Sequence, residues 1–98
     1  MKYKDYELFI VISKYQNNDN LALLLETKDG EPFGRLTTNI DSLPDTWCAI
    51  DTNNFPDSIV LIEKYELGMQ VGTIKSGFCT YPIYEMNMVE VNKYVRGN

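Results

Sequence analysis

The stretch YELFIVIS, residues 6–13, decides the fold of this chain. Apolar side chains occupy every even position, whereas the odd positions mix charged, polar and apolar residues. A period of two is that of a β-strand with one buried face, because successive side chains of a strand point to opposite sides. The stretch therefore predicts a strand rather than a helix.

The residues that follow predict a β-hairpin. The cluster QNNDN at residues 16–20 predicts a turn, since short amides and acids tolerate left-handed backbone. Residues 21–28 predict the next strand, and Asp29-Gly30 is a strong signal for a two-residue hairpin turn. Residues 31–39 then return antiparallel, with Pro32 suited to an edge position because it cannot donate to the ladder.

One helix is predicted in the second half, after a break at residues 41–45 and a short strand at residues 47–51. Asn53 or Asn54 can cap this helix, Pro56 fits its first turn, and Gly68 is a natural stop. Its apolar stripe consists of Phe55, Ile59 and Ile62, widened by Tyr65.

The remaining residues predict a second hairpin, with strands at residues 70–75 and 78–88 around the turn Ser76-Gly77. Residues 89–95 fit either the end of a strand or a short helix. The sequence therefore predicts a single α+β domain over residues 1–98. Its core is an antiparallel sheet of about five or six strands, with one main helix packed on a face.

Charge and composition restrict the classes of function. The chain of 98 residues has a net charge of −5 and no histidine, which removes the commonest general base and a common metal ligand. Fourteen acids and five bases lie between Asp5 and Glu90, so this stretch has a net charge of −9. Such a surface repels a phosphate backbone and attracts a basic protein. We expect no direct binding of nucleic acid.

No apolar run approaches the roughly 18 residues that cross a bilayer, and no secretory signal pattern is present. We therefore expect a cytoplasmic protein that binds no membrane. Cys48 and Cys79 are expected to be thiols that pack as small hydrophobic side chains.

Asp51-Thr52-Asn53-Asn54 is the first candidate site, because polar side chains at a helix start can hold an anion, a metal ion or a substrate amide. With Ser76 these residues would line a small-ligand pocket. The alternative, which capping preferences favour, is that they only cap the helix and turn the chain.

Catalysis by Cys79 or Asp51 is the least favoured reading. A reactive thiol needs a nearby cation or base, and Lys75 is the only candidate close to Cys79 in sequence. We expect no enzyme, no cofactor and no metal.

The chain also contains seven tyrosines, a residue type enriched at binding hot spots. Several are expected in the core, as strand propensity favours. Tyr3, Tyr15 and Tyr94, beside charges at the ends of predicted elements, are the candidates for a binding surface, together with the acidic Glu63 and Glu66 on the exposed face of the helix.

Three segments carry a family resemblance: Glu31-Pro32-Phe33, AIDTNNFP at residues 49–56, and SGFCTYPIY at residues 76–84. Over roughly residues 8–84 the chain resembles a family of small proteins with a domain of unknown function. The resemblance implies an association with plasmids, integrative elements and phages of Gram-positive bacteria. It implies no reaction and no cofactor. The family usually has arginine before the turn at Ser76, where this chain has Thr73 and Lys75, which weakens an anion-binding role there.

Our leading hypothesis is a non-catalytic acidic interaction protein of a mobile genetic element. Small acidic proteins of such elements are often inhibitors of host defence, of the anti-CRISPR or antirestriction type, which block a basic nucleic-acid groove. By this analogy the partner would be a basic host protein, such as a nucleic-acid-dependent nuclease. The alternative hypothesis is the small-ligand module at the helix start.

Overall fold

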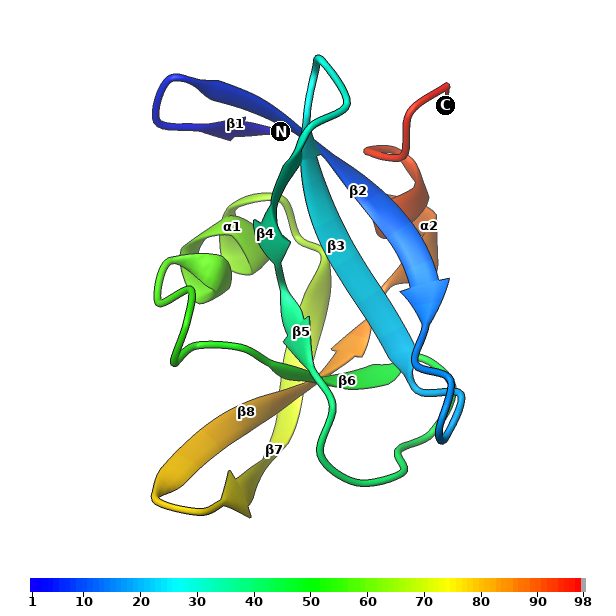
Figure 1. Ribbon diagram of the computed structural model, residues 1–98, viewed down its shortest axis with the longest axis vertical. Helices are drawn as coiled ribbons and strands as arrows, with labels where there is room; N and C mark the ends of the chain where they lie inside the picture. The colour runs from blue at the N-terminus through cyan, green and yellow to red at the C-terminus, as the bar shows by residue number, and fades with distance from the viewer. Residues whose placement is uncertain (98) are drawn as a thin grey trace.

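The computed structural model describes residues 1–97, and antiparallel strands dominate it (Figure 1). One four-stranded sheet has the order β1-β2-β3-β4, and the other has the order β5-β6-β8-β7. The first sheet consists of β1 (Lys2–Tyr3), β2 (Tyr6–Lys14), β3 (Leu21–Thr27) and β4 (Pro32–Arg35). The second consists of β5 (Thr37–Thr38), β6 (Trp47–Ile50), β7 (Gly68–Ser76) and β8 (Cys79–Met86). Two short helices, α1 (Ser58–Lys64) and α2 (Met88–Asn92), complete the fold.

The predicted α+β class, with one sheet and one main helix, is therefore wrong. The fold is mostly β, since the strands form two sheets and the helices contain only seven and five residues. The ambiguous residues 89–95 belong in part to the second helix, α2, which begins where the Asn87 side chain accepts hydrogen bonds from the N–H groups of Val89 and Glu90.

α1 is shorter than predicted because the chain turns at both of its ends. The capping prediction for Asn53 or Asn54 is wrong: the helix starts after Asp57, which makes no side-chain capping hydrogen bond. At the other end Glu66 has a φ of 55°, and the N–H of Leu67 donates to the Ile62 carbonyl over 2.9 Å. This is the hydrogen bond of a Schellman motif, with glutamate in the left-handed position that usually holds glycine.

The hairpin β2–β3 is paired as the sequence predicts. Ile10 lies opposite Leu25, and both side chains are buried. Gly30 has a φ of 84° in the turn between β3 and β4, the conformation for which glycine is needed there. β1, which the sequence did not predict, adds only two residues to the edge of β2.

Leu36 is the point at which the chain passes from one sheet to the other. The predicted single strand 31–39 is divided there into β4 and β5. The N–H of Leu36 donates to Leu23 of β3 over 2.9 Å, and its carbonyl accepts from the N–H of Asp51, just after β6, also over 2.9 Å. One residue thus connects both sheets through its main chain.

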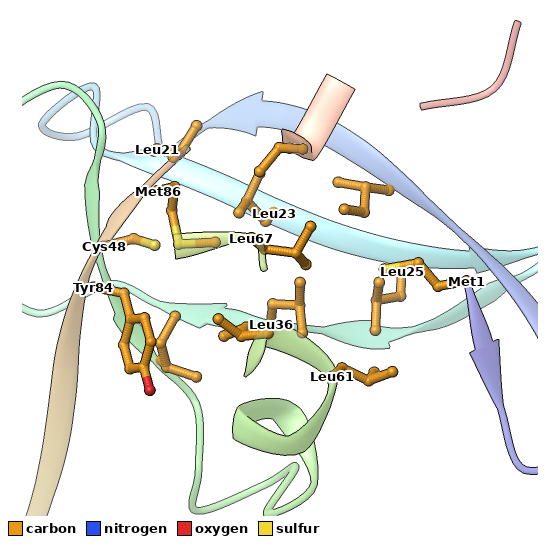
Figure 2. Close-up of a cluster of buried hydrophobic side chains, with 14 of the residues drawn as sticks. Met1, Leu21, Leu23, Leu25, Leu36, Cys48, Leu61, Leu67, Tyr84 and Met86 are labelled. Carbon is orange, nitrogen blue, oxygen red and sulfur yellow. The ribbon is translucent and has the colours of Figure 1, made fainter. Parts of the chain in front are cut away.

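The core lies between the inner faces of the two sheets and α1. Figure 2 shows side chains from β3, β6, β8 and α1 pointing into this one space. Leu23, Leu36, Ile50, Ile62 and Leu67 are among the residues with no exposed surface. Burial of each such side chain stabilises the fold by roughly 1.5–3 kcal/mol relative to exposure, so these residues account for much of the stability of the domain.

The β7–β8 hairpin projects from this core (Figure 1). Its tight turn has Gly77 at a φ of 61° and the fully exposed Phe78 beside it. Pro82, which has no N–H, lies just beyond the last residue of β8 that pairs with β6. The outer half of the hairpin is therefore two-stranded.

Candidate acidic docking site

An acidic hollow lies where α1 ends and the β7–β8 hairpin begins, with a volume of about 580 Å³. We use this name for the space lined by Thr46, Glu63, Glu66, Gly68, Met69, Glu85, Met86 and Asn87. The structure thus brings together the predicted acids Glu63 and Glu66, and adds Glu85, which the sequence analysis did not single out.

Two of the three carboxylates are oriented by neighbouring side chains. The Tyr84 hydroxyl donates to Glu63 Oε1 over 2.7 Å, and Trp47 Nε1 donates to Glu85 Oε2 over 3.2 Å. Burial, and then the hydrogen bond to Glu63, raises the pKa of Tyr84 to about 12. Tyr84 therefore stays a proton donor to Glu63 throughout the physiological pH range.

The third carboxylate, Glu66, is exposed and stands at the left-handed position after α1. Within residues 1–97, none of these three acids forms an ion pair. The neighbouring cation, Lys93, pairs with Glu90 over 2.9 Å, and the hydrogen bond to Glu90 raises the pKa of Lys93. The hollow thus carries three carboxylates without a paired cation, beside Met69, whose side chain is 64% exposed.

The three carboxylates of the hollow are not clustered. In the part of the chain that the structure describes, no three acidic or cysteine side chains are grouped closely enough to hold a metal ion. The three carboxylates are instead spread around an open hollow, which suits contact with a larger basic surface.

Asp51 has a structural role in its loop. It is 3% exposed, and its two carboxylate oxygens accept hydrogen bonds from the main-chain N–H and the side-chain amide of Asn54, over 3.2 and 3.1 Å. Both residues line a second hollow of about 300 Å³ with Arg35 and the rings of Phe33 and Phe55. Thr52, Asn53 and Ser76 do not line it.

The three candidate tyrosines are half-buried and contact different parts of the fold. Tyr3 donates to Asp57 over 2.6 Å, the Tyr15 hydroxyl lies 3.0 Å from that of Thr37, and Tyr94 packs against the Tyr65 ring with centroids 5.2 Å apart. None of these tyrosines lines the acidic hollow, and a binding role for them stays a prediction.

The two cysteines are unpaired thiols in different environments. Cys48 is 2% exposed, and burial raises its pKa to about 12. Cys79 is partly exposed and forms a hydrogen bond with Tyr81, which is the largest cause of the raised pKa of that tyrosine. Cys48 fits the predicted role of a small hydrophobic side chain, whereas Cys79 fits it only in part.

An irregularity in β7, which the sequence does not display, decides which residue lies opposite Glu85. Counted back from the turn at Gly77, an unbroken ladder would place Glu85 opposite Gln70. A register shift between Gln70 and Gly72 places Met69 opposite Glu85 instead, so Met69 rather than Gln70 lies beside this acid in the hollow. In the sequence, only the alternation of Tyr84, Glu85 and Met86 indicates that the Glu85 side chain points to the exposed side of its strand.

Neither helix in residues 1–97 has the length and apolar character that a membrane crossing requires. No curated protein and no solved structure matches the chain. A family model described as "Domain of unknown function (DUF4313)" matches residues 9–98, which is nearly the whole chain. The chain therefore belongs to the family of this domain of unknown function, DUF4313.

Proposed function

We propose that this chain is a non-catalytic interaction domain that docks through the acidic hollow on a basic surface of a partner protein. The observation that supports the proposal is the grouping of Glu63, Glu66 and Glu85 around one hollow without a paired cation among the described residues. Because Tyr84 and Trp47 already orient two of these carboxylates, less side-chain freedom is lost on binding.

The charge of the rest of the chain acts in the same direction. The net charge of −9 between Asp5 and Glu90 attracts a basic partner over a distance of about one Debye length, roughly 8–10 Å at physiological salt. Exposed Met69 adds apolar contact beside the acids. Attraction of this kind speeds association and weakens with salt.

The biological setting that we propose is the cytoplasm of a host that carries a mobile genetic element. There the domain would inhibit a nucleic-acid-dependent defence nuclease, of the CRISPR or restriction type, by occupying its basic groove. The support is the resemblance to proteins of plasmids, integrative elements and phages, together with the negative charge. It is an argument by analogy.

Capture from host lysate at low and high salt, with nuclease treatment, tests the proposal. We expect one basic protein that survives nuclease, elutes with salt and is lost with Glu63→Lys. Glu31→Lys is the matched control, because Glu31 is an exposed acid at the end of the β3–β4 turn, away from the hollow, and its substitution changes the charge equally. Capture that is insensitive to salt, or that both variants reduce equally, would count against docking through the hollow.

A small-ligand module is the second candidate, favoured by the position of Arg35 beside Asp51 and two aromatic rings in the second hollow. A guanidinium and aromatic faces suit an anionic, ring-containing ligand such as a nucleotide. A rise in thermal midpoint with nucleotides that Arg35→Gln abolishes would favour this candidate. An unchanged midpoint at millimolar nucleotide would exclude nucleotides.

A further inference from the structure

β7 has the longest open edge among the described residues. It is the last strand in the order β5-β6-β8-β7 and contains nine residues. The other strands at the ends of the two sheet orders, β1, β4 and β5, contain two, four and two residues. Seven of the nine residues of β7 are exposed, and among the described residues the strand forms no main-chain-to-main-chain hydrogen bond besides those of its ladder with β8.

The hydrogen-bond pattern shows which groups of β7 are available. Ser76 and Cys79 pair directly across the two-residue turn, which makes them a hydrogen-bonded pair. Because such pairs alternate with non-hydrogen-bonded pairs, the main-chain N–H and C=O of Thr73 and Lys75 point away from β8. Pro82 opposite Thr73 agrees with this alternation, since its missing N–H belongs to the side away from β7.

The two ends of this edge differ in charge. At the Met69 end, the strand borders the acidic hollow with Glu63, Glu66 and Glu85. At the other end, the only charged side chain of the strand is that of Lys75. A segment lying along the edge is therefore favoured when it is basic at the Met69 end and uncharged at the Lys75 end.

We propose that the free edge of β7 accepts an extended segment of the basic partner protein as an added strand, whose basic side chains at one end lie in the acidic hollow. This inference rests on the proposed function and specifies the form of the partner. Main-chain pairing would run along Gly72–Ser76, five residues or about 17 Å, where the register with β8 is unbroken. Beyond the shift at Gln70 the segment would leave the ladder and cross the hollow.

A synthetic peptide tests the inference without knowledge of the natural partner. The probe is a capped nonapeptide of alternating threonine and valine with three lysines at one end, made in both orders. Its control has the same sequence with main-chain N-methyl groups at alternate residues, which removes donors without changing charge. In titrations of the ¹⁵N-labelled chain we expect the unmethylated peptide to slow hydrogen exchange of the Thr73 and Lys75 amides at least tenfold. The methylated peptide should bind at least about fivefold more weakly, the effect of one lost hydrogen bond.

Variants of the chain provide the second arm. Thr73→Pro removes the outward N–H at an edge position that tolerates proline, and should weaken the peptide at least fivefold. Thr73→Val keeps the N–H and should bind as the unaltered chain does. If Thr73→Pro fails to fold, the comparison of the methylated and unmethylated peptides on the unaltered chain still tests main-chain pairing.

Three outcomes would overturn the added strand. If both peptides bind equally and only Glu63→Lys abolishes binding, the hollow is a docking site but the edge of β7 takes no part in it. The Thr73 amide could instead be protected from hydrogen exchange without peptide, increasingly so at higher protein concentration. Together with a dimeric mass, this result would assign the edge to a second copy of the chain. Absence of peptide binding with retained, salt-sensitive capture of a partner would reject the strand and keep the proposed function.

Discussion

Gly68→Ala should destabilise the domain, although alanine is normally the more favourable residue in a strand. A Cβ built at Gly68 lies 2.6 Å from the Glu85 carbonyl oxygen and 3.0 Å from Met86 Sδ. The carbonyl contact is about 0.8 Å shorter than the 3.4 Å at which ordinary van der Waals contact begins. Because the obstructing oxygen is main chain, the start of β7 and the end of β8 have to separate.

Such overpacking costs typically 1–3 kcal/mol. The gain from replacing glycine by alanine in the unfolded chain, about 0.5–1 kcal/mol, offsets only part of this cost. We therefore expect a net loss of about 1–2 kcal/mol, which lowers the thermal midpoint of a domain of this size by at least about 4 °C. Urea and thermal unfolding followed by circular dichroism measure both quantities.

Gly72→Ala is the matched control in the same strand. A Cβ there meets nothing within 4 Å, and the φ of Gly72 is not in the left-handed region. Its stability should be unchanged or higher by up to about 1 kcal/mol. Equal stability of the Gly68→Ala and Gly72→Ala variants would refute the reasoning, since the two substitutions differ only in what the new methyl group contacts.

Three further predictions concern the hollow and the thiols. Glu66→Gly should raise the free energy of unfolding by about 0.5–1 kcal/mol, because glycine fits the left-handed position, and should weaken capture of a basic partner; a less stable variant would contradict the assigned conformation. Because the pKa of Tyr84 is raised to about 12, its contribution to stability is complete below pH 10 and is lost as pH rises toward 12. Urea unfolding measured between pH 10 and 12 should therefore show a steeper fall in the free energy of unfolding for the unaltered chain than for Tyr84→Phe. Parallel pH dependences of the two proteins would refute this. In the folded chain at pH 8, Ellman's reagent should modify Cys79 well before Cys48, whose pKa burial raises to about 12; equal rates would mean that Cys48 is accessible.

The strands could be predicted because their information is local. The alternation at residues 6–13 and the turn residues Asp29-Gly30 and Ser76-Gly77 each specify an element within a few positions, and the structure has a strand or turn at each of these places. The two sheets could not be predicted, because the division depends on Leu36, whose main chain bonds to β3 on one side and to Asp51, just after β6, on the other. No local pattern distinguishes such a residue from the middle of one continuous strand.

The helix was overestimated for a related reason. Apolar spacing over residues 55–65 matches a helix, yet the N–H of Phe55 donates to Asp51 in a turn, and the chain leaves the helix at Glu66. The candidate site was predicted in part. Glu63 and Glu66 are predicted as exposed acids from the helix pattern, whereas their position near Glu85 depends on the packing of α1 against β8, which no local pattern displays.

The crossing at Leu36 has a consequence for cooperativity. Hydrogen bonds on both sides of one buried residue mean that neither sheet can open locally at this point without loss of the pairing in the other. The Leu36 and Asp51 amides should therefore exchange with solvent only through global unfolding, whereas the amides of the projecting β7–β8 turn exchange through small local openings. We therefore expect one folding unit with a projecting arm, in which local opening of the arm leaves the stability of the unit unchanged.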